Sequence, residues 1–236
     1  MGDQPLIDVD WILTNLGDPI GTSLLEHIKL SFLPILFGLL LALPLGVLSA
    51  RWKPLYPPVL AGVNILYAIP SIALFFLVLP YTSFSMWTAV IPLTLYTLAI
   101  LVPNVVDGLG QVPDHVRQAA TAMGFGPMRR LLQVDLPVAV PFVIAGLRIA
   151  SVATISMVSV ASLVGLGGLG QLILTEGFRN YKFLTPILVG IVLSVALAFL
   201  VDGLLVLLQR WLTPWTRDDS RKAARAAAPA PEGDPA

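Results

Sequence analysis

The feature that most constrains this chain is one long stretch without charge. No Asp, Glu, Lys or Arg occurs from Pro54 through Val106. Since about 20 apolar residues cross the hydrocarbon core of a bilayer once, this stretch is long enough for more than one crossing. Over the whole chain 56% of residues are hydrophobic and only 12% are charged, which is too little charge for an ordinary water-facing surface. The sequence therefore predicts an all-α membrane protein with the lipid bilayer as its surroundings.

Apolar segments at five places set the expected topology; they cover 28–50, 55–79, 86–106, 137–163 and 183–208. If the N-terminus lies outside, most Lys and Arg residues fall on the inner side, and only Lys29, Arg179 and Lys182 fall outside. Basic residues concentrate in the cytoplasmic loops of membrane proteins. We therefore expect about five transmembrane helices, with the N-terminus out and the C-terminus in.

Composition also excludes several kinds of site. The chain has no cysteine and only two histidines, His27 and His115, so we expect no disulfide, thiolate site or metal cluster. The acidic, polar start does not resemble a secretory signal, and the first apolar segment should be retained. No phosphate-binding loop with glycine, lysine and serine or threonine occurs. ATP is therefore not expected to bind this chain, and no nucleic-acid partner is expected.

One long hydrophilic loop, residues 107–136, separates the third and fourth apolar segments. It reads as two short helices, 114–123 and 127–134. Asp114 can cap the first, Gly124 suits the left-handed backbone that ends it, and Pro127 suits the first turn of the second. We expect Pro137 to break that second helix where the chain re-enters the membrane. Such a hairpin offers a soluble partner a compact surface, with Arg117, Arg129 and Arg130 available for ion pairs.

The spacing within this hairpin resembles the EAA loop of permeases from ATP-binding-cassette importers. The residues that carry the resemblance are Gln118, Ala119, Ala120, Gly124, Val134, Leu136 and Pro137. Gln118 stands where the family usually has glutamate, so that a hydrogen bond would replace an ion pair. The resemblance implies a type I (MetI-like) permease bundle in a bacterial inner or plasma membrane. It also implies a separate ATPase that carries ATP and Mg, a second permease subunit, and an extracytoplasmic substrate-binding protein.

Further segments resemble permeases for osmoprotectants such as glycine betaine, choline and related betaines. They are residues 68–74, the spacing from Asn104 to Gly108 and Leu109, residues 145–148 and residues 164–170. The resemblance implies a permease that couples ATP hydrolysis by its partner to alternating access. Permeases for methionine and other amino acids share parts of these segments and remain an alternative. An ion-coupled carrier or a membrane scaffold protein would be a rival from another class.

Several residues are candidates for a translocation path or an interface: Tyr67, Pro70, Ser71, Asn104 and Arg148. Aromatic rings can hold quaternary ammonium groups, although aromatic residues also gather at membrane interfaces for other reasons. An arginine exposed at mid-bilayer is costly. Arg148 should therefore either line the path or lie at the inner interface, and we expect Asp202, late in the last span, to reach the inner interface.

The glycine run Gly165, Gly167, Gly168 and Gly170 satisfies a dinucleotide-binding spacing. That fingerprint needs a strand before it and a helix after it, whereas a membrane span precedes this one. We therefore expect a tight re-entrant turn near the outer mouth. The chain divides into an external segment 1–22, a transmembrane permease domain 23–212 with its coupling loop, and a disordered cytoplasmic tail 213–236.

Overall fold

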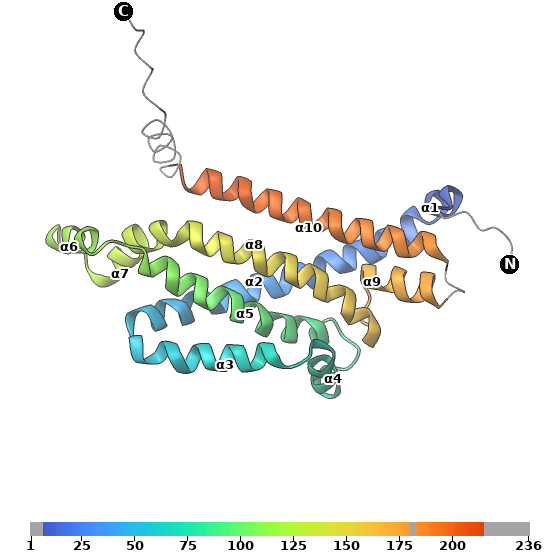
Figure 1. Ribbon diagram of the computed structural model, residues 1–236, viewed down its shortest axis with the longest axis horizontal. Coiled ribbons are helices and arrows are strands. Elements are labelled where there is room, and N and C mark those ends of the chain that lie inside the picture. Colours follow the sequence, from blue (N-terminus) through green and yellow to red (C-terminus); the bar gives the residue numbers. More distant parts are fainter. Residues whose placement is uncertain (1–6, 180–182, 215–236) are drawn as a thin grey trace, which may run out of the picture.

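The computed structural model describes residues 7–179 and 183–214, and every regular element in that part of the chain is a helix. Four helices are long and apolar: α2 (Thr22–Arg51), α5 (Trp87–Gly110), α8 (Leu136–Ala161) and α10 (Leu184–Leu212). The shortest has 24 residues and is about 36 Å long, enough to cross a bilayer. Figure 1 shows these helices lying roughly along one axis. The expected all-α membrane bundle is confirmed.

The expected crossing at 55–79 is not one straight helix. After a short 3₁₀ turn (Lys53–Leu55), α3 (Tyr56–Ala68) and α4 (Ser71–Thr82) meet at a bend of 92°. The break lies at Ile69 and Pro70, because proline has no N–H to continue the helix. The Tyr96 hydroxyl donates a hydrogen bond of 2.6 Å to the Ile69 carbonyl, so the broken backbone finds a partner inside the protein.

Helix α5 forms the centre of the bundle. Its residues Val90, Leu93, Leu101, Val102 and Val105 are almost completely buried between α2, α3 and α8. Small residues allow this close packing: a Cβ on Gly46 of α2 would lie 2.5 Å from Val105 Cγ1. By contrast, α10 lies along the outside of the bundle (Figure 1) and has few buried residues.

The hydrophilic loop forms a helical hairpin at one end of the bundle, which we call the hairpin end (Figure 1). It consists of α6 (Asp114–Ala122) and α7 (Pro127–Arg130), followed by a π-helical turn (Leu131–Asp135) that leads into α8. The expectation that Pro137 breaks the helix is wrong, since helix runs on from Pro127 to Val164. Pro137 occupies the first turn of α8, and the wider π-helical turn precedes it where its missing N–H would otherwise interrupt the hydrogen bonding.

The opposite end, the turn end, carries the N-terminal segment and the glycine run. Helix α1 (Val9–Thr14) is capped by Asp8, and it leads through a π-helical turn (Leu16–Gly21) into α2. The Asp8 N–H donates to Thr185 Oγ1 at 2.9 Å, which ties the segment to the start of α10. After α8 come a 3₁₀ turn (Ser162–Val164), α9 (Leu169–Gln171) and a π-helical segment (Leu172–Phe178). Residues 1–6, Lys182 and most of the expected tail at 213–236 lie outside the described residues.

Candidate functional site

The hairpin turns at Gly124, whose φ of +80° is the left-handed conformation expected there. The Phe125 N–H donates to the Ala120 carbonyl at 3.1 Å and closes the end of α6. Asp114, expected to cap this helix, makes no capping hydrogen bond. Its carboxylate lies 3.9 Å from Arg117 and is highly exposed. The turn is therefore built by glycine and backbone bonds.

Asp135 holds the two helices of the hairpin together. Its carboxylate is buried and lies 3.5 Å from Arg117 Nε and 3.6 Å from Arg130 Nε. Arg117 also donates to the Leu109 carbonyl at the end of α5. These two arginines, expected to be available to a partner, are engaged within the hairpin. Sequence reasoning missed Asp135, although it is a carboxylate just before an apolar span.

One further contact fixes the hairpin to α2, and others hold it together internally. Arg51, at the end of α2, donates to the Pro127 carbonyl at 3.0 Å. The Arg129 guanidinium lies 4.3 Å from the centre of the Phe125 ring, and its Nε donates to Gln133 at 3.0 Å. The hairpin is thus attached to α2 and α5 as well as continuous with α8. Any displacement of it would reach three of the long helices.

The surface of the hairpin is unusually apolar for a loop outside the bundle. Met123, Met128 and Leu132 are 69%, 62% and 57% exposed. Gln118 and Ala119 are also exposed, whereas Ala120 is buried against the rest of the hairpin. Leu136 and Pro137 are half-buried at the start of α8. Exposed apolar side chains of this size are typical of a surface that another protein covers.

The structure places the candidate path residues in three separate locations. Tyr67, Pro70 and Ser71 gather at the break between α3 and α4, where the Tyr67 ring packs edge-to-face on Tyr96 with centroids 5.5 Å apart. Asn104 lies in the contact between α5 and α8, close to the backbone of Gly146. Arg148 faces α10. The described residues therefore do not bring all five together.

Arg148 forms the strongest polar contact between α8 and α10. Its Nε and Nη2 donate to the two carboxylate oxygens of Asp202 at 2.6 and 2.8 Å. A two-pronged pair of this kind is geometrically specific as well as strong. Arg148 lies some 18 Å along α8, and Asp202 neutralises its charge there.

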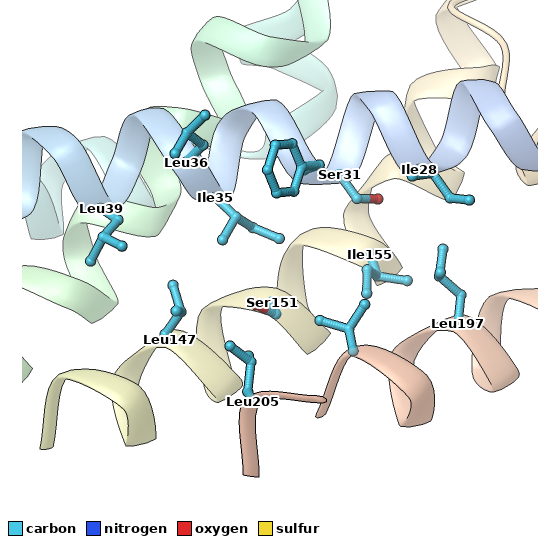
Figure 2. Close-up of a pocket in the computed structure, with 12 residues that line it drawn as sticks. Ile28, Ser31, Ile35, Leu36, Leu39, Leu147, Ser151, Ile155, Leu197 and Leu205 are labelled. Atoms are coloured by element: carbon cyan, nitrogen blue, oxygen red, sulfur yellow. The ribbon is translucent and has the colours of Figure 1, made fainter. Parts of the chain in front are cut away.

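An apolar groove of about 230 Å³ lies beside this ion pair, between α2, α8 and α10 (Figure 2). Figure 2 shows Ile35, Leu147 and Leu205 pointing into it from the three helices. The only hydroxyls in its lining are those of Ser31 and Ser151, and both are buried without a hydrogen-bond partner among the described residues. The groove lies where α2 and α10 face each other with almost no direct packing.

The glycine run forms a turn that accepts support from α2 through two side-chain hydrogen bonds. Gly165, Gly167 and Gly168 have φ of +74°, +83° and +79°, so the expected tight turn is present. The Gly168 N–H donates to Glu26 Oε2 at 3.0 Å, and the Leu169 N–H donates to His27 Nδ1 at 3.2 Å. His27 is fully buried, and its Nε2 lies 3.0 Å from the Ile155 carbonyl.

A Cβ on Gly167 would lie 2.2 Å from Glu26 Oε2, and a Cβ on Gly170 would lie 2.3 Å from the Ser159 carbonyl oxygen. The Gly168 and Leu169 amides of the run are already bonded to α2, and the run does not form a phosphate cradle. Sequence reasoning missed Glu26 and His27 as its partners. Within residues 7–179 and 183–214 no group of three metal-ligating side chains comes together.

Comparison with known proteins agrees with this architecture. OsmW of Salmonella typhimurium, an osmoprotectant import permease protein, is 34% identical and covers 87% of this chain and 97% of its own. OpuBB of Bacillus subtilis, a choline transport system permease protein, is 30% identical over 87% of this chain and 94% of its own. The inward-facing MetNI methionine transporter contains a chain that superposes with a TM-score of 0.75 at 29% identity, covering 82% of this chain and 96% of that one.

A family model provides the assignment. The model for binding-protein-dependent transport system inner membrane components matches residues 28–214, which include most of α2, the other three long helices and the hairpin. The same stretch holds the glycine turn. This chain therefore belongs to the family of inner membrane components of binding-protein-dependent transport systems.

Proposed function

We propose that this inner membrane component is the permease through which an ATP-driven importer takes up quaternary ammonium osmoprotectants such as glycine betaine and choline. The single observation that carries the proposal is the exposed apolar hairpin built into the start of α8. The relatives named as osmoprotectant, choline and carnitine permeases support the substrate class. The hydrolysis of ATP belongs to a separate partner subunit, and this chain holds no cofactor of its own.

The proposed partner of the hairpin is the ATPase. Met123, Met128 and Leu132 would insert into an apolar groove of that subunit, with Gln118, Ala119 and Gly124 at the contact. The hairpin end is then cytoplasmic and the turn end faces outward, in agreement with the placement of basic residues. A second permease subunit and an extracytoplasmic binding protein complete the proposed assembly, and residues 1–22 lie on its outer side.

Helix continuity gives the proposal a mechanism. Helix runs from Pro127 to Val164, so force applied at the hairpin passes along about 57 Å to the glycine turn. Asp135 binds α6 to this helix, and Arg148 binds α10 to it through Asp202. Closure of the ATPases would therefore move α6, α8 and α10 together, which is the rigid-body motion that alternating access requires. The bend at Pro70, with Tyr67 and Ser71, would line the path.

Reconstituted vesicles provide the test. The permease, its ATPase and its binding protein are placed in proteoliposomes, and uptake of radiolabelled choline and glycine betaine is followed with and without internal ATP. We expect uptake only with ATP and the binding protein, with little competition from excess methionine. ATP-independent uptake driven by an ion gradient would identify a secondary carrier, and inhibition by methionine would identify an amino-acid permease. Either result would overturn the proposal.

A further inference from the structure

A second pocket, of about 360 Å³, opens at the turn end of the bundle. It is lined by residues from α2, from the connection between α4 and α5, from the glycine turn and from α9; the lining includes Glu26, Lys29, Phe84, Met86, Gly167 and Gln171. This pocket is distinct from the hairpin and from the break at Pro70. Unlike the groove beside α10, it combines polar and apolar surface.

The pocket is lined by two charged side chains, those of Glu26 and Lys29. Glu26 accepts the Gly168 N–H through Oε2, so its carboxylate is fixed at the rim while Oε1 has no hydrogen-bond partner among the described residues. Lys29 lies one helical turn further along α2 and forms no ion pair with any described residue. A carboxylate and an ammonium therefore face one pocket without neutralising each other.

The apolar part of the lining suits one particular cation. Phe84 is 75% exposed, and Met86, two residues further along, is 43% exposed. Aromatic faces attract quaternary ammonium groups, and a nearby carboxylate adds to that attraction. Lys29 and the Gln171 amide can bind a carboxylate by donating hydrogen bonds. The lining is complementary to a small molecule that carries a quaternary ammonium at one end and a carboxylate at the other.

One residue of the lining, Leu30, belongs to a buried cluster with Phe75, Val158 and Val164. The pocket therefore borders the packed core of the bundle at the turn end. We infer that this pocket is a receiving site for a zwitterionic betaine, which it holds at the turn end before the bundle opens. The inference rests on the proposed osmoprotectant function and names a site for it.

Two charge-neutral variants test the site. Glu26→Gln keeps an oxygen that can accept the Gly168 N–H, so the turn is preserved while the negative charge is lost. Lys29→Met keeps the length of the side chain but removes the ammonium. Matched controls are Glu176→Gln, on the same end but outside this lining, and Lys53→Gln at the hairpin end. The ligands are radiolabelled glycine betaine, which has a carboxylate, and choline, which lacks one.

The measurement is equilibrium binding to the purified permease–ATPase complex without binding protein. We expect Glu26→Gln to weaken binding of both ligands about fivefold. Lys29→Met should weaken glycine betaine by a similar factor and leave choline unchanged or tighter, while the controls bind as wild type. Equal effects of Lys29→Met on both ligands, or no saturable binding to wild type, would overturn the site.

The same variants separate a failure of the site from a failure of the proposed function. ATP-driven uptake by the wild-type complex with its binding protein tests the function, whatever the pocket does. If both variants weaken association of the binding protein but leave ligand binding unchanged, the pocket is a docking surface and the receiving site is refuted. If wild type transports neither ligand, the proposed function has failed, and the receiving site fails with it.

Discussion

Arg148 Nε lies 2.6 Å from Asp202 Oδ1, and the two residues join α8 to α10, an outer helix with few buried residues. The pair is partly exposed, with 38% and 30% of the side chains accessible. Because it lies within the spans, each charge depends on the other for neutralisation. This relationship makes Arg148 a structural link between α8 and α10 and favours that role over lining a path.

Removing one partner of this pair should therefore be worse than removing both. Arg148→Met leaves Asp202 unpaired inside a span, whereas Arg148→Met with Asp202→Leu leaves an apolar contact. We expect the single variant to unfold at a clearly lower temperature in detergent and the double variant to recover most of the loss. Arg179→Gln serves as the control. Identical unfolding temperatures for the single and double variants would show that the pair does not hold α10.

Asp135 should affect the affinity for the ATPase indirectly, by holding the hairpin in shape. Asp135→Asn removes the buried charge that Arg117 and Arg130 share, and this should destabilise the hairpin. We expect the affinity of the permease for its ATPase to fall about tenfold in a pull-down titration. Asp114→Asn, at a carboxylate that is 88% exposed, should have little effect. Wild-type affinity for the Asp135 variant would mean that the hairpin is held by other contacts.

The glycine turn predicts a sharp contrast between two glycines. Gly167→Ala forces a Cβ to within 2.2 Å of Glu26 Oε2 at a positive φ, and we expect a loss of about 1–3 kcal/mol in the free energy of unfolding. Gly62→Ala in α3 meets no neighbour within 4 Å and should be neutral or stabilising. Chemical unfolding in mixed micelles measures both. Equal stability of the two variants would contradict the described turn.

The unpaired serines of the apolar groove should be dispensable. Ser31 and Ser151 bury hydroxyls without partners, so alanine there should leave stability unchanged or raise it by about 1 kcal/mol. Ser194 provides the control, because its hydroxyl donates to the Gly190 carbonyl at 2.8 Å. A marked loss of stability in Ser151→Ala, equal to that of Ser194→Ala, would show that the hydroxyl is bonded after all.

Much of this architecture is readable from the sequence, because hydropathy marks spans and glycine and proline mark their ends. The hairpin at 107–136 and its turn at Gly124 follow from local chemistry alone. The bend at Pro70 does not, because a hydropathy pattern shows that a segment is apolar but not the angle between its two halves. Pro137 led to a wrong expectation. It lies in the first turn of α8, after a π-helical turn, and the helix continues through it.

Long-range pairings are the part that sequence could not provide. Arg148 and Asp202 are 54 positions apart, and Glu26 and Gly168 are 142 apart. No spacing rule links such residues, because their meeting depends on how whole helices pack. Asp135 is different: a carboxylate next to an apolar span, shortly after Arg129 and Arg130, was a local signal that sequence reasoning overlooked.

The central claim is that the hairpin receives force from an ATPase, and a single-cysteine cross-link tests it most directly. The chain contains no cysteine, so Met123→Cys at the exposed tip and Tyr81→Cys, 87% exposed on α4, can each be the sole reactive thiol. In membranes that contain the ATPase, we expect a short thiol–amine cross-linker to join Met123→Cys to that subunit in an ATP-dependent yield, and to leave Tyr81→Cys unjoined. A cross-link to the ATPase from Tyr81→Cys and none from Met123→Cys would contradict the account.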